Sequence, residues 1–361
     1  MLVSITTNAA PPMNVPLDRV AVVMMSTVGN AVHTLPVVNS IRAHRPGVHI
    51  TWIMQPGAAE LVRGHPAVDE VIVADRKRGM AGFAELRRET ARRRFDVALN
   101  LQPYFKGGIA TALTRAPVRV GYDRARARDL TWLFSTHRLP PRPRAHVQDE
   151  FLEFLDFLDV PVRLEWGLEP TEEERSRYAP LLPDAPGPTI ALVVGTTKAE
   201  KEWPAERYAA LADAVAADFG ARTVLVGARS DREEAAAAAI RSAASHPPLD
   251  LREWDLRRVA YLLHRADVLV SPDTGPLHLS VALGTPAVAL MGHTNPKRYG
   301  PYRRFGELLV DAFGEPGEDY PVSAPNRAGR MGRITVDQVM GKVALALRGY
   351  RSSTPEGQSS P

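Results

Sequence analysis

The chain alternates between short apolar runs and longer segments in which apolar residues recur every three or four positions. Most of the short runs are continuously apolar, which indicates strands buried on both faces, and the longer segments have helical spacing. Strands are predicted over 19–25, 49–54, 70–74, 96–100, 189–194, 222–227, 267–271 and 287–291, and the clearest helices over 84–94, 148–158, 205–219 and 232–244. This alternation predicts an α/β fold with parallel sheets wound by helices.

The alternation breaks over residues 159–188, which are rich in Pro and Glu and have only a weak helical pattern at 171–182. We therefore expect two Rossmann-like, doubly wound domains. The predicted divisions are a disordered extension over 1–18, an N-terminal domain over 19–170, a linker over 171–188, a C-terminal domain over 189–348 and a disordered tail over 349–361. Ligands of open α/β sheets bind beyond the carboxyl ends of the strands, so we expect the two domains to face an interdomain cleft.

The amino-acid composition indicates a globular protein without a membrane span, a signal peptide or disulfides. A chain of 361 residues, 45% of them hydrophobic, can bury a sizeable core, and no apolar run reaches the roughly 18–20 residues that a membrane span needs. Residues 1–18 lack a basic region and a long apolar stretch, so a signal peptide is not expected. The chain has no cysteine, which fits a cytoplasmic location and excludes disulfides and thiolate metal sites.

The net charge of +4 comes from many arginines interleaved with acids. This pattern is typical of solvated helix faces, and an anionic ligand such as a nucleotide or lipid phosphate is the alternative. No basic stripe is interleaved with aromatic residues, so a nucleic-acid partner is not expected.

The most informative turn follows the predicted strand 267–271 and begins with Asp273, Thr274 and Gly275. Asp273 or Thr274 is expected to cap the short helix that comes next. The free N–H groups at the start of that helix would form an anion site, although an ordinary capped turn has the same sequence. His278, one turn into the helix, is either a core histidine or a ligand contact.

A second turn follows the predicted strand 189–194 and contains Thr196, Thr197, Lys198 and Lys201. Hydroxyls and a lysine at the carboxyl end of a strand suit a phosphate, and a surface lysine in a loop is the alternative. Neither the Walker spacing nor a complete G-x-G-x-x-G fingerprint is present, which argues against a dinucleotide-dependent oxidoreductase.

Two further turns carry polar candidates. After the predicted strand 222–227, Asp231 or Glu233 could accept a ribose hydroxyl, with helix capping as the alternative. After the first strand, Asn30 stands at the tip of a glycine turn in "VGNAVHTLP". An amide can orient a substrate by hydrogen bonds, but it cannot accept a proton at neutral pH.

Together these turns resemble the heptosyltransferases of glycosyltransferase family nine, over roughly residues 19–345. The segments that carry the resemblance are "DTGPLHLSVALGTP", "TTKAEKEWP" and "VGNAVHTLP", with the loop "GHTNP" at 292–296. The resemblance implies a GT-B fold and an inverting, metal-independent transfer from an ADP-sugar, without a cofactor. It implies that Lys201, not Lys198, contacts the donor phosphates. Thr196, Thr197 and the backbone at Thr274–Gly275 would also bind the diphosphate, and Asp273 would orient the donor or the helix start.

Asn30 departs from that resemblance, because the family commonly has an aspartate there, the proposed general base. Three interpretations remain open. Another group, His33 or an acid from the acceptor loops, takes the proton; the asparagine is an engineered substitution; or the protein is a slow or non-catalytic ADP-sugar-binding relative. The resemblance places Asn30, Lys201 and Asp273 at the catalytic centre.

The acceptor side is expected in the N-terminal domain. Its candidate residues are Gly29, Asn30, His33, Lys106 and Arg124, with Arg126 beside them. A solvated basic surface is the alternative for the cations. The resemblance implies a saccharide-containing acceptor, either lipopolysaccharide inner core at the inner membrane face, with peripheral membrane contact, or a small natural product. The sequence does not indicate an oligomeric state.

Overall fold

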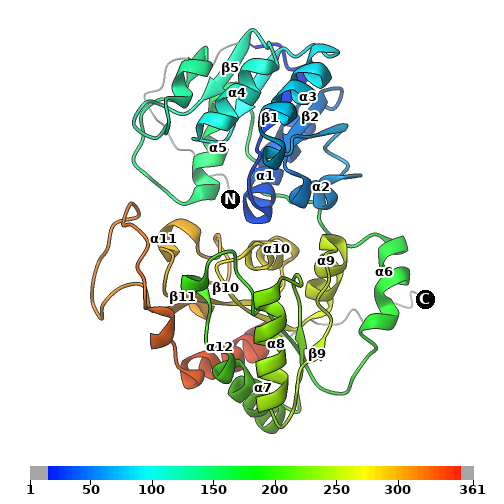
Figure 1. Cartoon of the computed structure of the whole chain (residues 1–361), viewed down its shortest axis with the longest axis vertical. Helices are drawn as coiled ribbons and strands as arrows, with labels where there is room; N and C mark the ends of the chain where they lie inside the picture. Colours follow the sequence, from blue (N-terminus) through cyan, green and yellow to red (C-terminus); the bar gives the residue numbers. More distant parts are fainter. Residues whose placement is uncertain (1–14, 351–361) are drawn as a thin grey trace, which may run out of the picture. The chain divides into compact units, whose positions relative to one another are not determined.

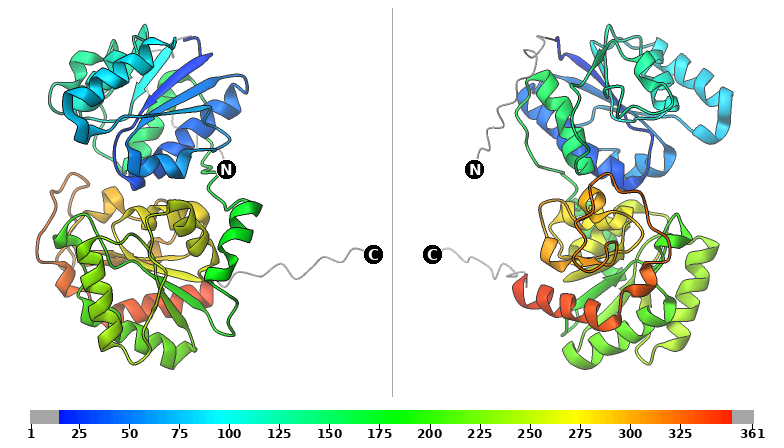
Figure 2. Two further views of the ribbon diagram at one scale, coloured as in Figure 1. Left: turned by 45° about the vertical axis from the view of Figure 1, so that its right-hand side comes forward. Right: turned by 90° about the vertical axis from the view of Figure 1, so that its left-hand side faces the viewer.

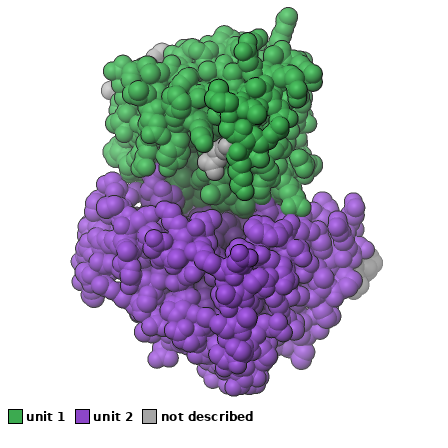
Figure 3. Space-filling view, in the orientation of Figure 1, with its two compact units in different colours: residues 1–167 green, residues 168–361 purple. Residues whose placement is uncertain are grey.

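The computed structural model describes residues 15–350. The chain divides into two compact units between Gly167 and Leu168 (Figure 3). The predicted extension and tail lie mostly outside the described residues. Within the predicted extension, however, Val15 and Leu17 are buried, and the carbonyl of Asp18 accepts a hydrogen bond from the His49 N–H at 2.7 Å. Disorder over residues 15–18 is therefore a wrong prediction, because these residues pack against the first sheet.

Unit 1 contains a six-stranded parallel sheet in the order β3-β2-β1-β4-β5-β6 (Figure 1). Its strands are β1 (Arg19–Val23), β2 (His49–Met54), β3 (Glu70–Val73), β4 (Val97–Asn100), β5 (Val118–Gly121) and β6 (His137–Arg138). Its helices are α1 (Val28–His44), α2 (Pro56–Val62), α3 (Gly79–Ala91), α4 (Phe105–Leu113) and α5 (Val147–Leu158), with 3₁₀ turns η1 (Arg76–Arg78) and η2 (Thr131–Phe134).

Unit 2 contains a second six-stranded parallel sheet, in the order β12-β11-β10-β7-β8-β9. Its strands are β7 (Thr189–Leu192), β8 (Arg222–Leu225), β9 (Leu249–Asp250), β10 (Val268–Pro272), β11 (Ala287–Met291) and β12 (Val310–Asp311). Its helices are α6 (Glu172–Tyr178), α7 (Ala205–Phe219), α8 (Asp231–Ala243), α9 (Leu256–Arg265), α10 (Gly275–Leu283), α11 (Pro296–Tyr299) and α12 (Val336–Gly349). Short 3₁₀ turns complete it: η3 (Ala179–Leu181), η4 (Ala199–Lys201), η5 (Gly306–Leu308) and η6 (Met331–Arg333).

Helices cover both faces of each sheet. In unit 1, α1 contacts α2 and α5, whereas α3 contacts α4, and Figure 2 shows α1 and α5 on the side of the sheet opposite α3. In unit 2, α7 contacts α8 and α12, whereas α9 contacts α10. The predicted α/β, doubly wound fold is thus confirmed, and each sheet has the Rossmann strand order 3-2-1-4-5-6. No helix within residues 15–350 combines the length and apolarity that a membrane crossing requires.

Candidate functional site

In both sheets the strand order reverses between the first strand and its neighbour on the other side. Open α/β sheets bind ligands at such a topological switch point, beyond the carboxyl ends of the two strands. The switch point lies between β1 and β4 in unit 1 and between β7 and β10 in unit 2. The loops after these four strands contain most of the predicted site residues.

At the switch point of unit 2, the loops after β7 and β10 meet through Lys201 and Asp273. The Lys201 ammonium donates to the Asp273 Oδ2 at 2.5 Å and to the Asp273 carbonyl oxygen at 3.2 Å. His278 Nε2 lies 3.2 Å from Asp273 Oδ1. The structure therefore brings Lys201 into one hydrogen-bonded cluster with Asp273 and His278, which follow it by more than seventy positions in the chain.

The neighbours of Asp273 stabilise the ionised form of its carboxylate. Its side chain is only 10% exposed, and those of His278 and Lys201 are 6% and 17% exposed. Burial alone would raise the pKa of Asp273. The hydrogen bond with His278 and the positive charge of Lys201 outweigh this effect and hold the pKa well below its usual range. One cation is thus held at the switch point of unit 2 by a buried carboxylate.

Trp203 fixes the loop that carries Lys201. Its indole is buried, donates to the Ile334 carbonyl oxygen at 2.9 Å, and packs edge-on against Tyr208. The Tyr208 hydroxyl in turn donates to the carbonyl oxygen of Val193, just after β7. Lys201 therefore projects from a short 3₁₀ turn that is anchored in the core of the unit.

The start of α10 is not capped by a side chain, contrary to the prediction. Thr274 is the N-cap residue, but its side chain makes no capping bond; its hydroxyl lies 2.9 Å from that of Ser271. The Asp273 carboxylate is occupied by Lys201 and His278. Neither predicted residue therefore takes up the N–H groups of the first turn, which carry the positive end of the helix dipole.

The two predicted threonines lie in the same loop as Lys201. Thr196 is half-buried, and its hydroxyl donates to the Lys198 carbonyl oxygen at 2.5 Å. Thr197 and Lys198 are exposed. The loop therefore separates its two lysines: Lys201 is tied into the cluster, and Lys198 points to solvent.

Glu233 closes a capping box at the start of α8. It accepts from the Ser230 N–H at 3.0 Å and from the Ser230 hydroxyl at 2.6 Å. Its side chain also lies under Gly195, where a Cβ would come within 2.0 Å of Glu233 Cγ. The capping alternative is what the structure shows for Glu233, and Asp231 is exposed in the same turn.

In unit 1, Asn30 lies in the first turn of α1, not at the tip of a loop. Its Nδ2 donates to the Ser26 hydroxyl at 2.8 Å, and its carbonyl oxygen accepts from Thr34. Gly29, beside it, is buried. The side chain is half-buried at the carboxyl end of β1.

His33 packs between α1 and α5. It is only 4% exposed, its Nδ1 lies 3.0 Å from Gln148 Oε1, and its ring packs edge-on against His146 and Phe151 of the α5 region. The ring is thus part of the α1–α5 packing, and the contact of His33 with the acceptor or its proton stays a prediction.

Of the predicted acceptor cations, two are exposed and one is buried. Lys106 and Arg124 are exposed, and Arg124 lies over the ring of Trp132 at 4.2 Å. Arg126 is 2% exposed and forms ion pairs with Asp123 at 2.5 Å and Glu153 at 2.8 Å. Arg126 is a buried structural residue, so its prediction as an anion contact is corrected.

The sequence prediction missed one polar residue at the carboxyl edge of each sheet. Asn100 ends β4 and is fully buried, and its Nδ2 has no partner within residues 15–350. Thr294, in the loop after β11, is 4% exposed, and its hydroxyl also has no partner there. An amide that closes an apolar strand was the signal for Asn100. Thr294 belongs to a quoted motif but was given no role.

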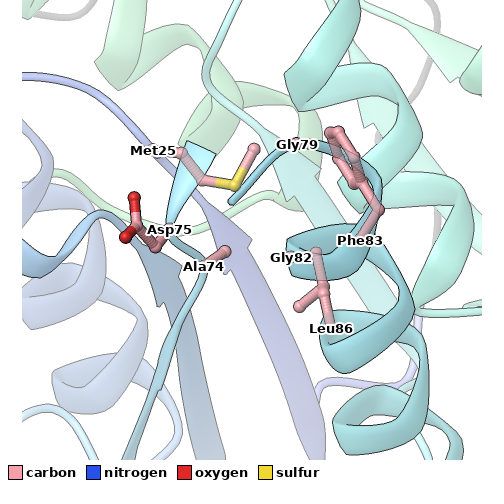
Figure 4. A pocket seen from close by; sticks show the side chains of 7 residues that line it. All are labelled: Met25, Ala74, Asp75, Gly79, Gly82, Phe83 and Leu86. Carbon is pink, nitrogen blue, oxygen red and sulfur yellow. The ribbon is translucent and has the colours of Figure 1, made fainter. Parts of the chain in front are cut away.

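A small apolar pocket also opens in unit 1 (Figure 4). It lies between Met25 and Ala74, which follow β1 and β3, and Phe83 and Leu86 of α3. It contains none of the predicted site residues. Among residues 15–350, no three His, Asp or Glu side chains gather in a way that could hold a metal ion.

The chain is similar to known proteins in sequence and in fold. Residues 83–312 match the model of glycosyltransferase family 9 (heptosyltransferase). The lipopolysaccharide core heptosyltransferase OpsX of Haemophilus influenzae is 26% identical over 332 residues, which cover 89% of this chain and 95% of that protein. A family 9 glycosyl transferase from Veillonella parvula superposes with a TM-score of 0.79 at 25% identity, over 93% of this chain and 99% of that one. The Escherichia coli heptosyltransferase WaaC, solved with ADP, has the same fold, with a TM-score of 0.73 at 24% identity over 91% and 99% of the two chains.

Proposed function

The chain belongs to glycosyltransferase family 9, and on that premise we propose that it moves a sugar, heptose in the first instance, from an ADP-sugar to an acceptor hydroxyl with inversion and without a metal. Unit 2 binds the donor and unit 1 the acceptor in this proposal. The observation that carries it is the Lys201–Asp273–His278 cluster beside the uncapped start of α10.

Lys201 and the first turn of α10 suit a diphosphate. A lysine ammonium and the N–H groups of a helix start are two common phosphate ligands, and both lie at the switch point. Asp273 binds Lys201 from the buried side, so the lysine keeps its orientation before the donor arrives. The relative WaaC was solved with ADP, which supports an adenine nucleotide as the donor's leaving group.

In the transfer, the acceptor hydroxyl attacks the anomeric carbon from the face opposite ADP, through an oxocarbenium-like state. The bond from that carbon to the diphosphate oxygen breaks, and ADP leaves with the additional negative charge. Lys201 and the N–H groups of α10 stabilise this charge as it develops. Asn30 orients the acceptor, and the hydroxyl proton leaves to solvent, because a neutral amide cannot accept it.

The acceptor in this proposal is lipopolysaccharide inner core at the cytoplasmic face of the inner membrane. OpsX, the curated relative described above, is a lipopolysaccharide core heptosyltransferase, which supports this choice over a small natural product. The exposed cations Lys106 and Arg124 of unit 1 suit an anionic acceptor.

A thermal-shift series with ADP, UDP, GDP and NAD tests the donor. We expect ADP alone to raise the melting temperature, and a response to UDP or NAD instead, or to none of the nucleotides, would contradict the assignment. Release of ADP from ADP-heptose in the presence of acceptor then tests catalysis. A protein that binds ADP but releases none from the ADP-sugar would be a binding-only relative. This is the alternative that Asn30, in place of the aspartate common in the family, leaves open.

A further inference from the structure

Unit 1 carries a group of exposed apolar side chains among basic ones, which we call the 104–138 patch. Tyr104 and Phe105 are 48% and 45% exposed at the start of α4, and Leu130 and Leu133 are 58% and 59% exposed around η2. The same segment of the chain contains four exposed cations: Lys106, Arg124, Arg128 and Arg138. Such a combination of apolar and basic groups on one surface marks an interaction site.

The backbone holds these apolar side chains outward. The Arg128 N–H donates to the Pro103 carbonyl oxygen at 2.7 Å, and the Thr131 hydroxyl donates to the same oxygen at 3.1 Å. Phe134 packs over Gly108 of α4, where a Cβ would lie 2.4 Å from its ring, and edge-on against Phe105. The segment after β5 is thus attached to the loop after β4, and the exposure of the leucines is built into the fold.

Leu130 is exposed in a backbone conformation that is unfavourable for leucine. Its φ is 59° and that of Asp129 is 52°, so two successive residues lie in the left-handed region. A side chain with a Cβ is disfavoured there, and asparagine or glycine is the usual residue. A leucine that is both strained and exposed gains nothing from this arrangement in the isolated protein, which points to a role in binding.

The cations of the patch are available to an anionic partner. Lys106, Arg124, Arg128 and Arg138 form no ion pair within residues 15–350, and Asp129 is the one exposed acid in the segment 101–138. Arg124 and Arg138 lie over the Trp132 ring, at 4.2 and 5.3 Å, and Arg128 lies 5.8 Å from the centre of the Tyr104 ring. Aromatic rings beside basic groups are typical of segments that lie in the lipid headgroup region.

We propose that the 104–138 patch docks unit 1 on an anionic lipid surface, with Leu130 and Leu133 inserted among the acyl chains and the arginines on the headgroup phosphates. Apolar insertion and attraction of cations to anionic lipid are the two contributions that peripheral binding needs. Single-stranded nucleic acid fits less well, because arginines lie over the Trp132 ring and leucines offer no plane on which a base can stack.

The patch follows β4 and β5, at the same edge of the sheet as Asn30. Docking would therefore hold the acceptor side of unit 1 against the bilayer, and this link to a lipid-anchored acceptor rests on the proposed function. The docking itself does not, because it requires neither donor nor acceptor.

Flotation of the full chain with lipid vesicles tests the proposal. Vesicles of phosphatidylcholine alone are compared with vesicles that also contain phosphatidylglycerol, in the absence of nucleotide and saccharide. We expect about 10-fold tighter binding to the anionic vesicles, lost in high salt. The double variants L130N/L133N and R124E/R128E should each bind at least about 10-fold more weakly.

Matched controls separate the patch from general effects. Trp254 is 69% exposed in unit 2, and Arg241 and Arg348 are exposed there, so W254N and R241E/R348E change the same chemistry elsewhere. Both should bind vesicles like the wild type. Because asparagine tolerates the left-handed region, L130N alone should raise the melting temperature, which excludes unfolding as the reason for weaker binding.

Three results would overturn the proposal: unchanged vesicle binding by L130N/L133N, equal losses in the unit 2 controls, or displacement of the wild type from vesicles by a single-stranded oligonucleotide. The ADP thermal shift distinguishes this failure from failure of the proposed function. A protein that floats with vesicles but does not respond to ADP keeps the docking surface and loses the donor assignment.

Discussion

The two units have the same strand order but different chemistry at their switch points. After β7 and β10, unit 2 presents a lysine, a carboxylate and a histidine in one cluster. After β1 and β4, unit 1 presents the neutral amides of Asn30 and Asn100. The topology thus determines where a ligand binds in each unit, and the side chains after the strands determine what is bound.

Under the proposed function, the difference between the two switch points corresponds to two tasks. The charged cluster of unit 2 suits a leaving group that gains negative charge, which must meet a positive field already in place. The amides of unit 1 suit a hydroxyl-bearing acceptor that must be oriented. Under the proposed function, the rate is therefore limited on the acceptor side, where no base stands at position 30.

The largest expected effect comes from placing a negative charge at the switch point of unit 1, where Asn30 is neutral. Asn30→Asp places a carboxylate in the first turn of α1, beside the Ser26 hydroxyl. If it acts as a general base, kcat should rise by about 10²–10⁴-fold, measured as ADP release with acceptor present. Asn30→Ala is the control and should not increase the rate. An N30D variant that is no faster than the wild type would show that another group already takes the proton.

The next effect comes from neutralising the buried carboxylate of unit 2. Asp273→Asn should lower the free energy of unfolding by about 2 kcal/mol at neutral pH, because it removes a charge-assisted bond to Lys201. The exposed pair Lys297–Asp319 is the matched control, and D319N should cost less than about 1 kcal/mol. Urea denaturation of the three proteins measures both changes.

The same comparison has a pH dependence whose sign follows from the pKa of Asp273. This pKa is lower in the folded protein than in the unfolded chain. The stability that the carboxylate contributes is therefore complete above its ordinary pKa of about 4 and is lost as the pH falls through the folded value. The difference between wild type and D273N should remain constant down to about pH 5 and shrink below about pH 4. A difference that grows in acid would contradict the ion pair.

The smallest expected effect comes from Gly195, which follows β7 in unit 2 and lies against Glu233. Gly195→Ala places a Cβ 2.0 Å from Glu233 Cγ, so Glu233 must move and its capping box with Ser230 weakens. We expect a loss of about 1 kcal/mol in unfolding free energy together with a weaker ADP thermal shift. Gly47→Ala, where nothing lies within 4 Å of the new Cβ, should stay within about 0.5 kcal/mol. Equal behaviour of the two variants would show that the loop is not closely packed there.

The sequence predicted the interior of the fold and missed its edges. Every predicted strand is present, because a continuous apolar run of five or six residues is diagnostic of a buried parallel strand. The missed strands β5, β6, β9 and β12 are two to four residues long. They contain polar residues such as His137 and Asp250, because β6, β9 and β12 are edge strands with one neighbour each and β5 lies next to an edge.

The site was predicted in part. Strand ends followed by polar turns located Lys201, Asp273 and His278, but only the resemblance to known enzymes favoured Lys201 over Lys198. The contact between Lys201 and Asp273 depends on the loops after two strands that are distant in sequence and adjacent in the sheet. The sequence did not predict the packing of His33 against α5. Because α1 is buried on nearly all sides, its periodicity does not distinguish a core histidine from a ligand contact.

The central claim is that Lys201, held by Asp273 at the switch point of unit 2, binds the donor diphosphate. The most direct test is calorimetric titration of ADP into the wild type, Lys201→Ala and Lys198→Ala. We predict that ADP affinity falls by about 10–100-fold in K201A, as loss of a charge-assisted bond requires, and stays within about 2-fold in K198A. Equal affinities of the wild type and K201A, or a larger loss in K198A, would contradict the account.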